Sequence, residues 1–204
     1  MEAPFWHERW AKHEIGFHMP KPHAALERYW SSLKLDPGSR VFVPLAGKSL
    51  DLVWLAQVRH QVVGIELSSV AVDEFKAEHP GESAIDLRCG DFFDLTSDTL
   101  GPIDAIFDRA SLVALPPAMR RDYAAHITAL SKPGTQMLLV TMEYEQSQMK
   151  GPPHAVLERE VQSLYGAHHD IETLERIEVL ADYPRMIERG VTALAERVYR
   201  LKRR

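Results

Sequence analysis

The stretch RVFVPLAGKSLDLVWLAQVRHQVVGIE, residues 40–66, decides the fold. Its first part, Val41 to Leu45, is a short apolar run rich in β-branched and aromatic residues that ends at a turn, which predicts a buried strand. Apolar residues then recur at helical spacing from Leu50 to Val58, and a second apolar run, Val62 to Ile65, ends in Glu66. The pattern is that of a β-turn-α-β unit with two parallel strands.

The turn of this unit contains Gly47, and it shares a sheet edge with the carboxylate of Glu66. An acid about 20 residues past a glycine turn is placed to accept hydrogen bonds from ribose hydroxyls. A P-loop would need a glycine where the sequence has Phe42, and a pyrophosphate site would need the G-x-G-x-x-G pattern. A nucleoside that carries an amino-acid tail instead of phosphates, such as S-adenosylmethionine, fits this turn. The alternative is an ordinary βαβ unit that binds nothing.

Composition limits the remaining possibilities. With 204 residues, 45% of them hydrophobic and 26% charged, the chain can form one sizeable core, so we expect a single domain with an arm over residues 1–39 and a core over residues 40–204. The net charge of −5 gives no attraction to nucleic acid or to an anionic membrane. One cysteine, no apolar run of about 18 residues and no signal-peptide pattern lead us to expect a cytoplasmic protein.

The N-terminal arm is rich in aromatic residues and histidines. Trp6 and Trp10 lie four residues apart, which places them on one face of a helix that begins near Pro4. Phe17 belongs to an apolar segment without a clear element of its own. The arm is either a lid over the nucleoside site or a segment that simply packs on the sheet. The histidine spacings fit no usual ligand pattern, so we expect no metal.

The rest of the chain alternates between helix and strand signals. We expect helices at residues 23–33, 68–79, 116–131 and 155–165, and strands at residues 84–89, 103–107, 136–142, 171–180 and 191–201. The last two strands follow one another without a predicted helix, which indicates an antiparallel strand inserted at the sheet edge. Cys89 falls within a predicted buried strand and is a poor candidate for a nucleophile.

Two further strand ends carry candidate site residues. After the strand at 84–89, Asp91 can accept a hydrogen bond from an adenine amino group while Phe92 covers the ring. The alternative is that Asp91 only caps a turn. After the strand at 103–107, Arg109 would emerge at the same edge, where the cofactor's methyl group and its acceptor must meet. The alternative is a surface salt bridge with Asp108 or another acid.

Five ordered motifs resemble those of the thiopurine S-methyltransferases, especially the bacterial ones, over essentially the whole chain. They are F-W-H-E-R-W at 5–10 with I-G-F-H at 15–18, V-P-L-A-G-K-S-L-D at 43–51, V-V-G-I-E-L-S at 62–68, C-G-D-F-F-D-L at 89–95 and D-R-A-S-L at 108–112. The resemblance implies an α/β fold of the class I S-adenosylmethionine-dependent methyltransferases. Such a fold is Rossmann-like, with a seven-stranded, mostly parallel sheet, an antiparallel last strand and an N-terminal helical arm as lid.

The resemblance also implies roles for single residues. Glu66 would bind the ribose, Leu45 the methionine part, and Arg109 the region between cofactor and acceptor. Phe17 would lie near the acceptor. The full set implied at the cofactor is Trp10, Leu45, Gly47, Glu66, Asp91, Phe92 and Arg109.

The chain departs from this family at two places. Most relatives have cysteine at the position of Ala46, a change that leaves a backbone contact intact. Between Glu66 and Cys89 the chain is shorter than the bacterial members, near Pro80 to Ser83. That segment borders the active site, so the range of acceptors stays open.

The expected reaction is in-line methyl transfer from S-adenosylmethionine to the sulfur of an aromatic or heterocyclic thiol such as 6-mercaptopurine. Such thiols ionise near neutral pH, so no general base is required, and Arg109 would stabilise the thiolate. The alternatives are selenium or tellurium oxyanions or other small thiols as acceptors, and a cofactor-binding regulatory module without turnover. A nicotinamide oxidoreductase is disfavoured by the missing glycines. We expect a monomer whose partner is a small molecule.

Overall fold

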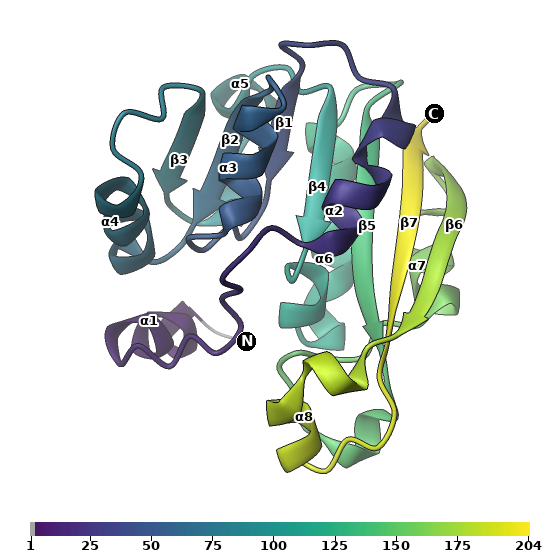
Figure 1. Ribbon diagram of the computed structural model, residues 1–204. Coiled ribbons are helices and arrows are strands. Elements are labelled where there is room, and N and C mark those ends of the chain that lie inside the picture. Colours follow the sequence, from purple (N-terminus) through teal and green to yellow (C-terminus); the bar gives the residue numbers. More distant parts are fainter. Residues whose placement is uncertain (1–2) are drawn as a thin grey trace.

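The computed structural model describes residues 3–204, and its centre is one seven-stranded sheet with the order β3-β2-β1-β4-β5-β7-β6 (Figure 1). Strands β1 to β5 are parallel, whereas β7 runs antiparallel to both of its neighbours. The strands are β1 (Arg40–Val43), β2 (Gln61–Glu66), β3 (Ile85–Cys89), β4 (Ala105–Arg109), β5 (Gln136–Glu143), β6 (His169–Glu178) and β7 (Ala195–Arg203). The predicted sheet with an antiparallel last strand is therefore confirmed.

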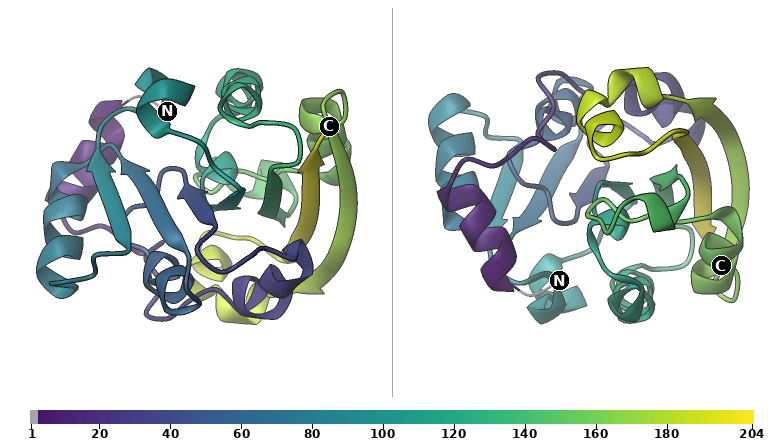
Figure 2. Two further views of the ribbon diagram at one scale, coloured as in Figure 1. Left: turned by 90° about the horizontal axis from the view of Figure 1, so that it is seen from above. Right: turned by 90° about the horizontal axis from the view of Figure 1, so that it is seen from below.

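Helices cover both faces of this sheet (Figure 2). The α-helices are α1 (Ala3–Ala11), α2 (Ala24–Tyr29), α3 (Leu50–Gln57), α4 (Ser69–Glu78), α5 (Ser97–Leu100), α6 (Pro117–Leu130), α7 (Glu158–Tyr165) and α8 (Pro184–Glu188). The 3-10 segments are η1 (Trp30–Leu33), η2 (Phe92–Asp94), η3 (Leu112–Ala114), η4 (Gln146–Gln148) and η5 (Leu180–Asp182). Within residues 3–204, no helix combines the length and apolar composition needed to cross a membrane.

The prediction that no helix lies between the last two strands was wrong. The connection from β6 to β7 contains η5 and α8. These helices have three and five residues, too few for a helical repeat of apolar side chains to show in the sequence. Proline at the first turn of α8 supplies the local start signal, since its fixed φ suits that position.

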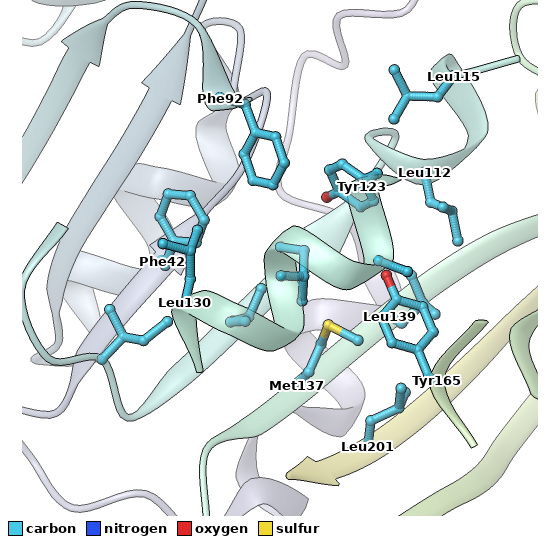
Figure 3. Packing of buried hydrophobic residues seen from close by; sticks show 14 of the residues in the cluster. Phe42, Phe92, Leu112, Leu115, Tyr123, Leu130, Met137, Leu139, Tyr165 and Leu201 are labelled. Carbon is cyan, nitrogen blue, oxygen red and sulfur yellow. The ribbon is translucent and has the colours of Figure 1, made fainter. Parts of the chain in front are cut away.

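The core forms two layers, one on each face of the sheet. In β1, Phe42 packs into the layer under α6 and α7, whereas Val41 and Val43 pack into the opposite layer. This alternation follows from the two-residue period of a strand, and the three buried residues, Val41 to Val43, are all apolar because helices cover both faces. Figure 3 shows Phe42, Phe92 and Tyr123 together in the first layer.

The parallel strands all point toward the end of the molecule where α1 and α8 lie (Figure 1). The connections that leave β1, β2, β3 and β4 meet at this edge. In open α/β sheets, ligands bind outside the carboxyl ends of the strands. The fold therefore places the candidate residues of the first four strands along one edge, beneath an N-terminal helix and the α8 connection.

Candidate active site

The carboxylate of Glu66 joins the turns that follow β1 and β2. Its Oε2 accepts a hydrogen bond from the backbone N–H of Gly47 at 2.9 Å, and its Oε1 accepts one from the N–H of Ser68 at 2.7 Å. Burial raises the pKa of this carboxyl group, while the backbone donors oppose the rise. Two carboxylate oxygens offer about four acceptor positions, so capacity remains for donors of a ligand.

The turn after β1 approaches the arm closely. Leu45 and Gly47 both adopt positive φ, at +45° and +54°, and a leucine in that region is uncommon and typical of functional sites. A Cβ atom on Gly47 would lie only 3.1 Å from Cζ2 of Trp10. Glycine at this position lets the indole ring cover the turn directly.

The arm runs along the edge of the sheet from the β1 turn to α8. Trp10 is only 2% exposed, and its ring packs edge-to-face on that of Phe17 at 5.6 Å between centroids. Further along, Gly16 is crossed by Arg185 of α8, because a Cβ atom on Gly16 would lie 1.3 Å from the guanidinium Nη1. Within the arm, His23 contacts the core, because its backbone N–H donates to Asp51 Oδ1 at 2.7 Å. The arm therefore reaches from the β1 turn to the α8 side, as a lid would.

We expect Trp10→Ala to release this arm without unfolding the sheet. Removing a buried indole weakens docking by several kcal/mol in a core, but here the lost contacts hold only a local segment. Trypsin cleavage at Lys12 should then become at least about tenfold faster, with little change in the unfolding temperature. Trp6→Ala is the matched control, because Trp6 is only partly buried. Equal cleavage rates in wild type and Trp10→Ala would contradict the docking role.

In the turn after β3, Phe92 is buried whereas its neighbours Asp91 and Phe93 are exposed. Asp91 is exposed, and its Oδ1 accepts the N–H of Phe93 at 2.9 Å, which caps η2. The ring of Phe92 is only 4% exposed and lies against Tyr123 at 4.8 Å between centroids (Figure 3). The exposed ring of this turn belongs to Phe93, which the sequence did not single out. That Asp91 and Phe92 bind adenine stays a prediction.

The expectation that Cys89 is buried was wrong. It is exposed, and its Sγ lies 3.7 Å from the carbonyl oxygen of Leu67. The reason is its place at the end of an edge strand. Leu87, two residues earlier on the same face of β3, is only 3% exposed, so burial stops before the strand ends.

Arg109 and Asp108 end β4 but face opposite ways. Asp108 is fully buried and accepts the hydroxyl of Tyr123 at 2.9 Å, and burial raises its pKa to about 6. It therefore does not pair with Arg109. The guanidinium of Arg109 lies instead near Tyr183 and Glu196, where it influences the pKa of both.

The structure thus brings Trp10, Gly47 and Glu66 into one unit and places Leu45 in the same turn. Arg109 lies toward α8. Among the described residues, no group of three or more metal-ligating side chains occurs. Tyr183 and Glu196 were missed, because they lie in late segments where no motif or periodicity marks a polar site.

Known proteins of one family match the chain over its full length. The family model described as thiopurine S-methyltransferase matches residues 1–204. The thiopurine S-methyltransferase of Bordetella petrii is 46% identical over 217 aligned positions, with 100% of this chain and 99% of that protein covered. That of Pseudomonas fluorescens SBW25 is 46% identical, with 98% of this chain and 99% of that protein covered. The first alignment exceeds the 204 residues of this chain, so the chain lacks residues that this relative carries.

Solved structures share the fold at lower identity. A Burkholderia thailandensis 1,6-didemethyltoxoflavin-N1-methyltransferase with bound S-adenosylhomocysteine has a TM-score of 0.67 at 17% identity, covering 98% of this chain and 86% of that chain. An S-adenosylmethionine-dependent methyltransferase from Thiobacillus denitrificans has a TM-score of 0.67 at 15% identity, covering 97% and 98%. Together with the full-length family match, these findings show that the chain belongs to the thiopurine S-methyltransferase family.

Proposed function

We propose that the protein transfers the methyl group of S-adenosylmethionine to the sulfur of an aromatic or heterocyclic thiol such as 6-mercaptopurine. Membership in the family makes the chain a methyltransferase with S-adenosylmethionine as its methyl donor. The observation that supports the proposed site is the Glu66 carboxylate, held between the β1 and β2 turns beneath Trp10.

The residues at this edge fit the cofactor. The carboxylate of Glu66 is fixed by two backbone donors and retains acceptor capacity for ribose hydroxyls. Gly47 has no side chain that would fill the space below Trp10. In the proposal, Leu45 contacts the methionine part, and Asp91 with Phe92 contacts the adenine.

When bound, S-adenosylmethionine supplies a methyl group on a positively charged sulfur. Arg109 then binds the acceptor thiolate and holds its sulfur toward the methyl group, and Phe17 forms an apolar wall of the acceptor pocket. Trp10 and the arm exclude water, which strengthens electrostatic interactions within the site. No side chain needs to remove a proton, because the acceptor reacts as a thiolate. Catalysis rests on alignment, a contribution that reaches about 7 kcal/mol or more in well-oriented reactions.

The proposal extends to the setting of the reaction. The acceptor is a small molecule, and residues 1–204 act as one domain with residues 1–39 as the lid. A net charge of −5 supports the absence of a nucleic-acid or membrane partner. We propose a cytoplasmic monomer.

The test is production of S-adenosylhomocysteine by the purified protein with S-adenosylmethionine and 6-mercaptopurine, with Glu66 variants beside it. Glu66→Ala should abolish product, and Glu66→Gln should raise the Kd of S-adenosylhomocysteine about 10- to 100-fold, because a charged acceptor of hydrogen bonds is lost. Glutamine keeps one carbonyl for the neighbouring backbone N–H groups. Calorimetry measures the Kd.

Glu172→Gln is the matched control, because Glu172 pairs with Arg200 at the surface and lies on β6, at the sheet edge opposite to the β1 and β2 turns. It should leave both measurements unchanged. Tight cofactor binding without product would redirect the search to selenium or tellurium oxyanions, other small thiols, or a regulatory module. Unchanged affinity in Glu66→Gln would refute the ribose role.

A further inference from the structure

A lysine in the turn after β1 is held by two carboxylates of α4. The Nζ atom of Lys48 lies 2.9 Å from Oε2 of Glu74 and 2.6 Å from Oε1 of Glu78, and its side chain is only 11% exposed. Burial opposes the charged form of Lys48, but the hydrogen bonds to Glu78 and Glu74 outweigh it and raise the pKa of the ammonium group. Charged contacts therefore tie the turn that contains Gly47 to α4.

The two carboxylates are unfavourable for α4 itself. Glu74 and Glu78 lie four residues apart, so two like charges are neighbours on one face of the helix. Glu78 is also the last residue of α4, where the helix dipole favours a positive charge. Departures from local rules of this kind are typical of functional sites. The ammonium group of Lys48 offsets the repulsion, so the favourable partner of this helix face is the β1 turn.

Glu74 has a second partner, which belongs to the N-terminal arm. Its Oε1 lies 3.4 Å from Nδ1 of His13, while its Oε2 faces Lys48. His13 has a φ of +52°, in the left-handed region that is uncommon for residues other than glycine. Its backbone N–H donates to the carbonyl oxygen of Trp10 at 3.0 Å. The turn that follows α1 thus places the partner of Glu74 next to the tryptophan that covers the β1 turn.

These contacts form a closed ring. Trp10 lies on the β1 turn, because a Cβ atom on Gly47 would be 3.1 Å from Cζ2 of the indole. Lys48 is the next residue of that turn, and Glu74 connects it to His13, three residues after Trp10. The arm therefore meets the turn directly through its indole ring and indirectly through the carboxylate of α4.

We propose that Glu74 is a positioning residue that joins Lys48 of the β1 turn to the arm, holds Trp10 over the bound cofactor and slows its release. The proposal rests on the cofactor site proposed above at the β1 and β2 turns. Release of the cofactor then requires the arm to open, and opening breaks the contact between Glu74 and His13.

The primary test is Glu74→Gln, which keeps the size of the side chain and removes its charge. The dissociation rate constant of S-adenosylhomocysteine, measured by surface plasmon resonance on immobilised protein, should rise about fivefold, because the arm is open for a larger fraction of the time. Trypsin cleavage at Lys12, in protein saturated with S-adenosylhomocysteine, should become faster by a similar factor. Lys48→Met removes both contacts with α4 and should increase both rates about tenfold. Unchanged rates in Glu74→Gln would overturn the proposal.

Asp73→Asn is the matched control. Asp73 is the exposed residue before Glu74 on α4, and its replacement removes the same charge from the same turn of the helix. Both rates should stay within about twofold of those of the wild type. Equal increases in Asp73→Asn and Glu74→Gln would indicate a general effect of charge on α4 and would also refute the positioning role.

A double-mutant cycle shows whether Glu74 acts through the arm. The side chain of His13 is 69% exposed, so His13→Gln leaves the core intact and should speed cofactor release only about two- to threefold. In a Glu74→Gln background the same change should add nothing, because the partner of His13 is already lost. Additive increases would show that the two residues act independently and would contradict the link to the arm.

The cofactor site and the positioning role fail in different ways. If Glu66→Gln leaves the affinity for S-adenosylhomocysteine unchanged while Glu74→Gln speeds its release, the ribose role falls and the role of Glu74 stands. If Glu66→Gln weakens binding and Glu74→Gln releases the cofactor at the rate of the wild type, the site stands and the positioning role falls. A wild-type protein that does not bind S-adenosylhomocysteine would overturn both.

Discussion

Replacing Arg120 by methionine is expected to lower the free energy of unfolding by about 3 kcal/mol. The side chain is 1% exposed and makes a charged pair with Glu160, both of whose carboxylate oxygens lie 2.8 Å from Nη1. Its Nε donates to the carbonyl oxygen of Leu115 at 3.0 Å, and its Nη1 donates to that of Ala155 at 3.1 Å. Arg120 therefore fastens the connection before α6 to the one before α7, both at the edge that carries the site.

Methionine would fill most of the space but leave two carbonyl groups without their donor. Urea unfolding followed by circular dichroism measures the loss. Arg121→Met is the control, because Arg121 is the exposed neighbour on the same helix and its loss should cost less than about 0.5 kcal/mol. Equal midpoints for the two variants would show that the buried network contributes little.

The second large effect is a pH dependence of stability that comes from Asp108. Burial raises the pKa of its carboxyl group from 3.8 to about 6 in the folded protein. Between these values the folded state holds a proton that the unfolded state has lost, so this group's contribution to stability falls as the pH rises from about 4 to 6. The shift corresponds to about 3 kcal/mol.

Asp108→Asn should remove this dependence. The difference in unfolding free energy between the variant and the wild type should shift in favour of the variant by about 3 kcal/mol between pH 4 and pH 7. Asp104→Asn is the control. Asp104 directly precedes β4, and the pH dependence of its contribution to stability has the opposite sign. The backbone N–H of Arg40 lowers the pKa of Asp104, so its contribution is lost as the pH falls. A flat difference curve for Asp108→Asn would contradict the buried acid.

The β1-α3-β2 unit shows how much local sequence can specify. Its strands and helix follow from a two-residue period, a 3.6-residue period and one glycine turn. Those signals also place Glu66 at the edge of the sheet, because parallel strands bring their carboxyl ends together. The same rule predicted that Arg109 lies at this edge, and the structure places Arg109 at the end of β4.

Side-chain direction at the strand ends was less predictable. Phe92 and Phe93 are identical in chemistry and adjacent in sequence, yet the first is buried and the second exposed. Which ring points inward depends on η2 and on Tyr123, a residue about 30 positions away, against which Phe92 packs. Cys89 was misjudged for a similar reason, since only the strand order shows that β3 is at an edge.

The sequence by itself determined the fold class and the family. It also determined that the first four strands end at one edge and that Glu66 lies there. Each of these depends on residues close together in the chain. Only the tertiary structure decided that β7 lies between β5 and β6, that the arm is anchored at Asp51 and Glu196, and that Tyr183 donates to Glu196. These contacts join residues that are 28 and 173 positions apart at the arm. Their formation depends on how the layers pack, and no local period or spacing carries that information.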